Sequence, residues 1–231
     1  MHPPESSVLW ARMVDTQTPP PASRGGGTFL LDFFRTRPWA KRAVSIVSAL
    51  LLIAGVALLA YPFATNLYQN RLQDKLSKQL ASPSLKQKYR NRAIGVGDSL
   101  TRIKMPAIHV DVVVVEGITP TALRAGAGHY PQTPLPCEKG NVAIAGHRTT
   151  YGKPFADIDQ LRVGDQIELD TPVGGCVYQL QRAPFVVDKS DLSVLNQSND
   201  KTLTLTSCHP KGSAAKRIIV KAVWVKDLQG A

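Results

Sequence analysis

Two kinds of hydrophobic pattern divide the chain. Residues 43–64 contain no charged side chain, and the stretch from Val44 to Ala60 is almost wholly apolar. A helix needs about 20 mostly apolar residues to cross a bilayer, so this run predicts a transmembrane anchor over residues 43–64. After residue 93 the apolar residues come instead in short stretches separated by turns, which is typical of β-strands.

The charges that flank the apolar run predict its orientation. Lys and Arg residues crowd into positions 35–42, directly before the run, and such flanks stay on the cytoplasmic side. We therefore expect residues 1–42 to be a cytoplasmic basic tail and residues 94–231 to be extracellular. A cleaved signal peptide is the alternative. However, the run starts far into the chain and exceeds the roughly 7–15 residues of a signal core.

The segments on either side of the anchor differ in composition. Residues 1–28 are rich in Pro, Ser, Thr and Gly, which predicts disorder. Residues 65–93 are good helix formers with a leucine at every fourth position from 72 to 80, until Pro83 interrupts the pattern. This segment predicts a helical stalk that breaks into a linker.

The pattern beyond the stalk predicts one all-β domain. Turn signals such as Gly97-Asp98 and Gly164-Asp165 separate the apolar stretches, and about 135 residues suffice to bury a single core. A barrel or a sandwich fits this rhythm. Two short stretches, 121–124 and 155–160, look helical. The predicted strands are 99–105, 110–115, 142–145, 166–170, 177–181, 202–206 and 217–225.

Charge is unevenly distributed along the chain. The formal net charge is +11, yet residues 66–93 carry seven Lys/Arg against one Asp/Glu, whereas residues 94–231 carry fifteen against thirteen. The excess therefore belongs to the stalk. It favours contact with anionic lipid heads or wall polymers over a nucleic-acid site on the globular domain. A solvated helix that only aids solubility is the alternative.

Three cysteines limit the chemistry further. Cys137, Cys176 and Cys208 form no CxxC pair, which argues against a zinc site. No acidic cluster resembles a calcium loop, so we expect no metal or other cofactor. If Cys208 is a reactive thiol, a bridge can join only Cys137 and Cys176. The sequence leaves open whether these two residues approach closely enough for a disulfide.

Three polar residues stand at the edges of predicted strands. His147 follows the apolar stretch that ends at residue 145, Cys208 ends the run from Thr204, and Arg217 opens the last strand. Such positions are rigid and reachable by solvent, which suits a nucleophile, a base and an oxyanion stabiliser. A thiolate needs a cationic neighbour, and a histidine can also protonate a leaving amine. Taken singly, each residue could equally be structural.

Taken together, these residues carry a family resemblance. The segments GHR at 146–148 and TLTSC at 204–208, with Arg217 downstream, resemble the sortases, membrane-anchored cysteine transpeptidases whose signature is TLxTC. Serine replaces the last threonine of that signature at position 207. The resemblance covers nearly all of residues 94–228 and implies an eight-stranded sortase-type β-barrel with short helices. The longer segments at 145–155 and 208–210 look most like class E sortases of actinobacteria.

The resemblance also implies a reaction. Cys208 would attack the Thr–Gly bond of a C-terminal sorting signal, with His147 as acid and base and Arg217 steadying the peptide and the oxyanion. A peptidoglycan-precursor amine would then resolve the thioacyl enzyme. Class E members are associated with LAXTG signals, and Tyr130 matches the tyrosine implicated in that choice. Thr206 and Ser207 are expected to contribute hydroxyls to the substrate pocket.

The other histidines of the domain are expected to be structural, and two other functions fit the same residues. His129 and His209 flank candidate site positions, and we expect structural roles for both; His109 has no acidic or cysteine partner nearby. A membrane-tethered cysteine protease, which hydrolyses its substrate, would use the same triad. A non-enzymatic β-domain that binds wall polymer would instead need Cys208 only as a structural thiol.

Overall fold

The computed structural model describes residues 38–228, with the surroundings of Pro38 and of residues 62–66 left aside. The tail predicted for residues 1–42 therefore falls largely outside the described residues. The chain forms one compact unit that ends at Ala57 and a second that begins at Leu58.

The first helix, α2 (Pro38–Leu80), contains the predicted anchor. Its segment Trp39–Tyr61 is, within the described part of the chain, the one helical stretch long and apolar enough to cross a membrane. Residues 41–61 are all exposed, including large apolar side chains such as Leu52 and Leu58. A helix that is apolar all round and exposed is solvated better by lipid than by water.

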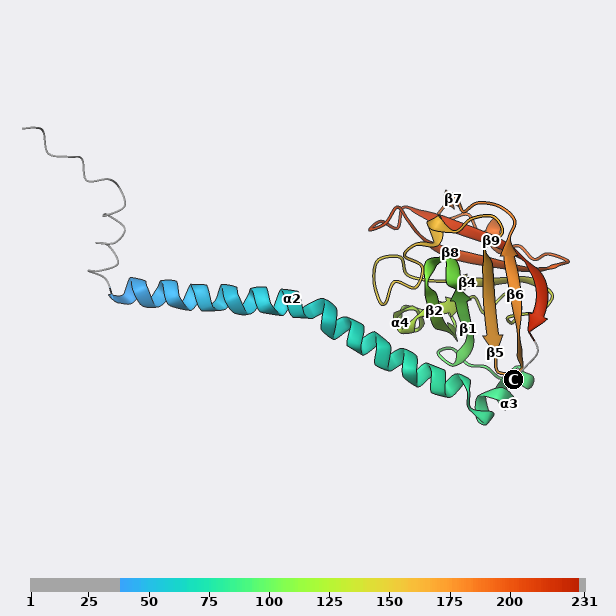
Figure 1. The fold of residues 1–231 in the computed structure, drawn as a ribbon, viewed down its shortest axis with the longest axis horizontal. Coiled ribbons are helices and arrows are strands. Elements are labelled where there is room, and N and C mark those ends of the chain that lie inside the picture. The colour runs from blue at the N-terminus through green and yellow to red at the C-terminus, as the bar shows by residue number, and fades with distance from the viewer. Residues whose placement is uncertain (1–37, 229–231) are drawn as a thin grey trace, which may run out of the picture. The chain divides into compact units, whose positions relative to one another are not determined.

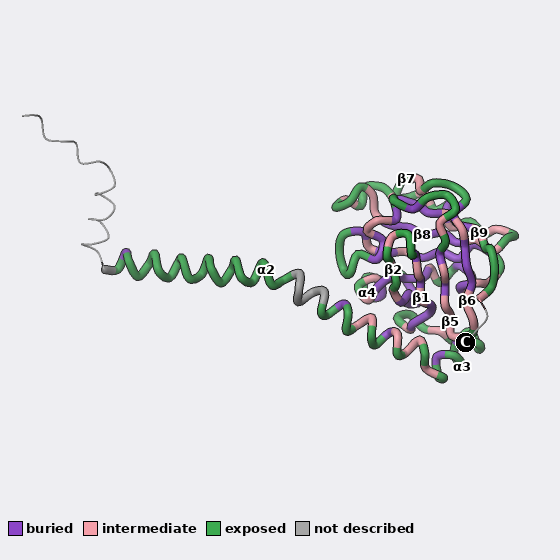
Figure 2. Tube along the Cα trace, in the orientation of Figure 1, coloured by how far each residue is buried: buried purple, intermediate pink, exposed green. Residues whose placement is uncertain are grey.

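The C-terminal part of α2 is not a free stalk, because it packs on the globular domain. Leu76 is buried against Val113, Val115 and Ala122, and Figure 2 shows buried and intermediate residues from Gln69 onward. Full burial of one leucine contributes about 2 kcal/mol. The leucines spaced four apart therefore form the face of the helix that packs on the domain. The basic residues lie on its exposed faces.

A glutamine side chain completes this docking. The amide oxygen of Gln73 accepts a hydrogen bond from the Val113 backbone N–H at 2.7 Å, and its amide nitrogen donates to the Ala125 carbonyl at 2.8 Å. The helix thus satisfies one backbone group of strand β2 and one at the end of the short helix 120–125. After it, α3 (Pro83–Arg90) is capped by the Ser82 hydroxyl and buries Leu85 and Tyr89.

The globular domain is a closed β-barrel (Figure 1). Its strands follow the order β6-β5-β1-β2-β3-β4-β8-β9, and a β6–β9 pairing closes the ring; β7 is a ninth strand that pairs with β9 alone. The predicted eight-stranded barrel is confirmed. The strands are β1 (Ser99–Met105), β2 (Val110–Glu116), β3 (Ala127–His129), β4 (Gly140–Ala145), β5 (Gln166–Thr171), β6 (Gly174–Leu180), β7 (Phe185–Asp188), β8 (Lys201–His209) and β9 (Lys216–Leu228).

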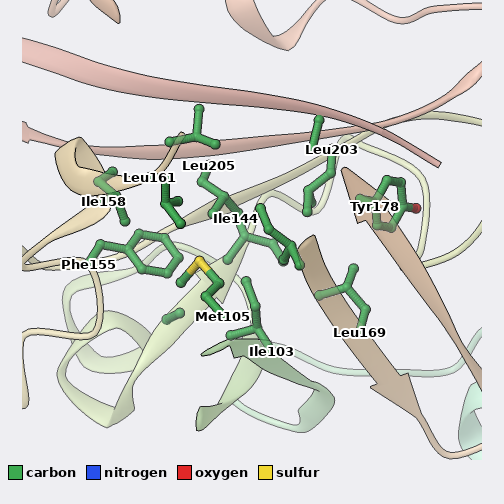
Figure 3. Packing of buried hydrophobic residues seen from close by; sticks show 14 of the residues in the cluster. Ile103, Met105, Ile144, Phe155, Ile158, Leu161, Leu169, Tyr178, Leu203 and Leu205 are labelled. Carbon is green, nitrogen blue, oxygen red and sulfur yellow. The ribbon is translucent and has the colours of Figure 1, made fainter. Parts of the chain in front are cut away.

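Alternate residues of these strands fill the barrel. Figure 3 shows side chains from several strands converging on one apolar cluster. The cluster includes Ile103, Ile144, Leu169, Leu203 and Leu205, and none of these is exposed. Because strand side chains alternate between faces, the residues next to these positions in sequence point away from the core. This alternation decides which side chains reach the candidate site.

Several short elements differ from the sequence expectation. β3 and β7 were not predicted, because a three-residue strand containing glycine and an edge strand of four residues give almost no periodic signal. The short helices are η1 (Pro106–Ile108), α4 (Pro120–Ala125), η2 (Ile158–Gln160) and η3 (Ser193–Leu195). The helix predicted at 155–160 is therefore only the single turn η2, because Phe155 is drawn into the core.

A disulfide joins Cys137 to Cys176, with the Cα atoms 5.7 Å apart. The pairing left open by the sequence is thus present. Cys137 lies in the β3–β4 connection, whereas Cys176 is fully buried in β6. The bridge therefore fastens the loop that begins at Tyr130 to strand β6, at the core of the barrel. Cys208 remains as a free thiol.

Candidate active site

The candidate site forms where β4 and β8 end side by side. The two strands pair in parallel from Gly140 opposite Lys201 to Ala145 opposite Thr206. The Gly146 N–H extends this ladder by donating to the Thr206 carbonyl at 3.1 Å. His147 and Cys208 each follow the last pair of this ladder by two residues.

The arginine joins from the other side of β8. β9 runs antiparallel to β8, and Arg217 is directly opposite Cys208. Directly opposed residues project to the same face of a sheet. The two pairings thus bring together the three segments that carry His147, Cys208 and Arg217, which are far apart in the sequence. We call these three residues the row.

This row lies on the outer face of the barrel wall. Leu203 and Leu205 of β8 belong to the core, so Thr204, Thr206 and Cys208 point outward. Cys208 is half-buried, which leaves its thiol within reach of a substrate. A nucleophile on a rigid strand with an accessible thiol suits covalent catalysis.

Glycine at position 146 explains how the chain turns into the histidine. A Cβ atom there would lie 2.5 Å from the ring of Phe155, so a larger residue would push this core aromatic away. The Phe155 N–H also donates to the His147 carbonyl at 3.1 Å. The core therefore fixes the backbone of His147 from below.

The environment of His147 favours an uncharged imidazole. Partial burial lowers the pKa of His147 below its ordinary value, because removal from water disfavours the cation. The Tyr151 ring packs against it with centroids 5.1 Å apart, and the Arg124 guanidinium lies 5.6 Å from the centroid of that same ring. A neutral imidazole near pH 7 can accept the proton of an attacking thiol.

Arg217 is held near the turn between β8 and β9. Its guanidinium donates to the carbonyls of Ala214 and Lys216 at 3.1 and 3.0 Å. These two bonds occupy one nitrogen, Nη1, so the remaining N–H groups are free to meet a negative charge. Its half-buried position beside Cys208 is compatible with the predicted oxyanion role.

Of the three predicted pocket residues, two meet and the third faces elsewhere. The Tyr130 hydroxyl lies 3.1 Å from the Thr206 hydroxyl, and Thr206 shares the outward face of β8 with Cys208. By contrast, the buried Ser207 hydroxyl donates to the Gly146 carbonyl at 2.7 Å on the opposite face. This bond ties β8 to the residue before His147, whereas the predicted contact of Ser207 with substrate stays a prediction.

Comparison with known proteins identifies the family. The sortase domain model matches residues 103–225, which is more than half of the chain and includes all three residues of the row. This chain belongs to the sortase family. The family resemblance inferred from the motifs is thereby confirmed, and sortases are cysteine transpeptidases.

Individual sortases resemble the chain over its globular part. Sortase D of Bacillus subtilis is 34% identical over 51% of this chain and 60% of its own length. Sortase SrtE1 of Streptomyces coelicolor is 34% identical over 57% of this chain and 42% of its own length. The matches thus span less than two thirds of the length of each of these two relatives. A sortase D5 transpeptidase structure from Clostridium perfringens superimposes with a TM-score of 0.60 at 32% identity, covering 68% of this chain and 98% of that one.

A buried arginine, Arg148, lies next to this row. The sequence alone indicated no role for it. Arg148 directly follows His147, yet it is only 3% exposed. A charged residue just after a strand is normally assumed to be solvated, so only its position in the GHR motif marked it. Tyr151 was missed in the same way, since nothing in the sequence shows that its ring turns back onto His147.

His129 has the structural role expected of it. It is 1% exposed, and its Nδ1 lies 2.8 Å from a Glu116 carboxylate oxygen, while Nε2 lies 2.9 Å from the Pro134 carbonyl. Both ring nitrogens thus lie within hydrogen-bond distance of oxygen atoms. This contact anchors the start of the loop that carries Tyr130, directly next in sequence.

Proposed function

We propose that this protein is a membrane-anchored transpeptidase of the housekeeping type. It would cleave the Thr–Gly bond of LAXTG- or LPXTG-like sorting signals and join the released surface protein to a peptidoglycan-precursor amine. One observation supports the proposal: β8 pairs in parallel with β4, the strand that leads into His147, and antiparallel with β9, where Arg217 is opposite Cys208. The specific substrate and acceptor come from the class E resemblance.

The first half-reaction acylates the enzyme. The Cys208 sulfur bonds to the threonine carbonyl carbon while its proton passes to the neutral His147. Arg217 N–H groups stabilise the oxyanion. The C–N bond to glycine then breaks, and His147 gives the proton to the leaving amine. The product is a thioester between Cys208 and the surface protein.

The second half-reaction releases the surface protein from the thioester. The acceptor amine nitrogen attacks the thioester carbonyl carbon, and the C–S bond breaks. One proton of the amine returns, through His147, to the Cys208 sulfur. Water in place of the amine would give hydrolysis, so product identity separates a transpeptidase from a protease that uses the same residues.

The proposed topology has a cytoplasmic N-terminus, residues 43–64 in the membrane and an extracellular catalytic domain. Two observations support it. The segment Trp39–Tyr61 meets the length and composition of a spanning helix. The Cys137–Cys176 bridge suits an oxidising compartment, since disulfides are rare in the cytosol.

Product analysis tests the proposed activity directly. The full chain in detergent micelles would be incubated with a fluorescent LAXTG peptide and an excess of a short glycine-terminated amine. We expect mass spectrometry to show the peptide cleaved after threonine and ligated to the amine. Release of only the free acid would contradict transpeptidation, and an intact peptide would contradict the activity altogether.

Tyr130→Phe tests the specificity part of the proposal. The variant loses the hydroxyl that meets Thr206, and one hydrogen bond contributes about 1 kcal/mol, or roughly fivefold. We expect the ratio of kcat/KM for LAXTG over LPXTG peptides to fall by about that factor. Tyr68→Phe, on the exposed surface of α2, is the matched control. An unchanged ratio would remove Tyr130 from the choice of substrate.

A further inference from the structure

The Arg148 side chain is a buried charge that contacts both the segment after His147 and the end of strand β8. Burying a guanidinium is costly unless its N–H groups are satisfied. Its Nε donates to the Ala156 carbonyl at 3.2 Å, and its Nη2 pairs with the Asp159 carboxylate at 2.8 Å. Its Nη1 lies 3.4 Å from the Cys208 carbonyl and 3.2 Å from Nδ1 of His209.

These contacts join the two segments that carry the nucleophile and the base. Arg148 belongs to the histidine segment, whereas Cys208 and His209 end strand β8. The β4–β8 ladder has its last residue pair at Ala145 and Thr206. His147 therefore lies beyond the backbone pairing between β4 and β8, whereas Cys208 is still paired with Arg217 of β9. Another interaction must hold the histidine segment against Cys208.

The other links between these segments differ from Arg148. The Ser207 hydroxyl bonds to Gly146 one residue before the histidine. Lys211 pairs with Asp157 at 2.7 Å, but both side chains are more than 40% exposed. An exposed ion pair contributes little, about 0–1 kcal/mol. Among the described residues, Arg148 is the one member of the histidine segment whose buried side chain donates a hydrogen bond to the backbone of Cys208.

We propose that Arg148 is a positioning residue that holds His147 and Cys208 in reacting alignment, with His209 as its neutral acceptor. The assignment rests on the proposed transpeptidase function. Guanidinium nitrogens only donate hydrogen bonds, so Nδ1 of His209 accepts and carries no proton. Arg148 itself touches no reacting atom.

The substitutions follow from this geometry. Arg148→Lys keeps the charge but loses the planar fork that reaches Ala156, Asp159 and the end of β8 at once. His209→Asn retains an acceptor at the place of Nδ1, whereas His209→Leu removes it. Lys211→Met breaks the exposed link between the same two segments and is the matched control.

Steady-state kinetics with the sorting peptide and the full chain give the first readout. A misplacement of about 1 Å can cost roughly 100-fold in rate. We expect Arg148→Lys to lower kcat about 10- to 100-fold with KM within about twofold, and His209→Leu to lower kcat in the same direction. His209→Asn and Lys211→Met should keep kcat within about threefold of wild type. If the loss only follows the unfolded fraction measured by circular dichroism, the positioning role is wrong.

Alkylation of Cys208 by iodoacetamide gives a second readout that needs no substrate. The alkylation rate is measured as a function of pH. Because His147 is aligned with the thiol, the wild-type pH profile should show one inflection from titration of the imidazole and another from titration of the thiol. Arg148→Lys should lose the imidazole inflection, as His147→Ala does. An unchanged profile in Arg148→Lys overturns the proposal even if the sorting peptide proves not to be a substrate. Failure of peptide cleavage by wild type would instead contradict the transpeptidase function.

Discussion

Replacing Cys208 with alanine is expected to reduce cleavage of the sorting peptide by at least about 1,000-fold. The reaction passes through a thioester on this sulfur, and loss of a catalytic nucleophile costs far more than loss of a supporting contact. Arg217 and His147 would remain, but without the thiol there is no proton for His147 to accept and no attack that forms the oxyanion. Quenched-fluorescence assays on the full chain, with mass spectrometry of the products, measure the change.

The fold of this variant should be unaffected, which makes the result interpretable. Cys208 is half-buried on the outer barrel face and lies outside the disulfide. We expect its melting temperature to stay within about 2 °C of wild type, as for surface substitutions. Full cleavage by Cys208→Ala would contradict the mechanism and favour a structural thiol in a wall-binding domain.

The strand pattern of the barrel could be predicted because its inward residues alternate regularly. The predicted strand 99–105 coincides with β1, and the run from 202 onward coincides with the core of β8. Elements without periodicity were missed. β3 exists because it pairs with both β2 and β4, and such pairing is a property of the assembled sheet and not of three residues.

The candidate row was predictable as a set of residue types, but its geometry was not. Cys208 and Arg217 end up opposite each other because of the antiparallel register, and His147 joins them because β4 happens to run parallel to β8. The motif resemblance named these residues in advance. Nothing in the sequence shows that Arg148 is buried beneath them.

The segment called a stalk shows how a local pattern can mislead about context. A leucine at every fourth position indicates one apolar helix face, and this part of the prediction agrees with α2. The identity of the partner surface is a tertiary property, supplied here by Val113 and Val115 of β2. The amide of Gln73 adds hydrogen bonds that no helical periodicity can reveal.

Removal of the disulfide is the second change with a large expected effect, here on stability. The bridge spans a sequence separation of 39 residues, for which the loop-entropy relation gives about 4 kcal/mol in the free energy of unfolding. The double variant Cys137→Ala, Cys176→Ala should therefore melt about 10 °C lower than wild type, given about 2–4 °C per kcal/mol for a domain of this size.

Cys208→Ala supplies the matched control for this stability effect, because it loses a cysteine and keeps the bridge. Dithiothreitol should lower its melting temperature toward that of the double variant, whereas the double variant should not respond. The bridge also fastens the loop that begins at Tyr130 to β6. Its loss should therefore loosen the loop that carries Tyr130 more than it loosens Cys208 and Arg217 on β8 and β9. Equal melting temperatures for Cys208→Ala and the double variant, without dithiothreitol, would show that the bridge does not stabilise the barrel.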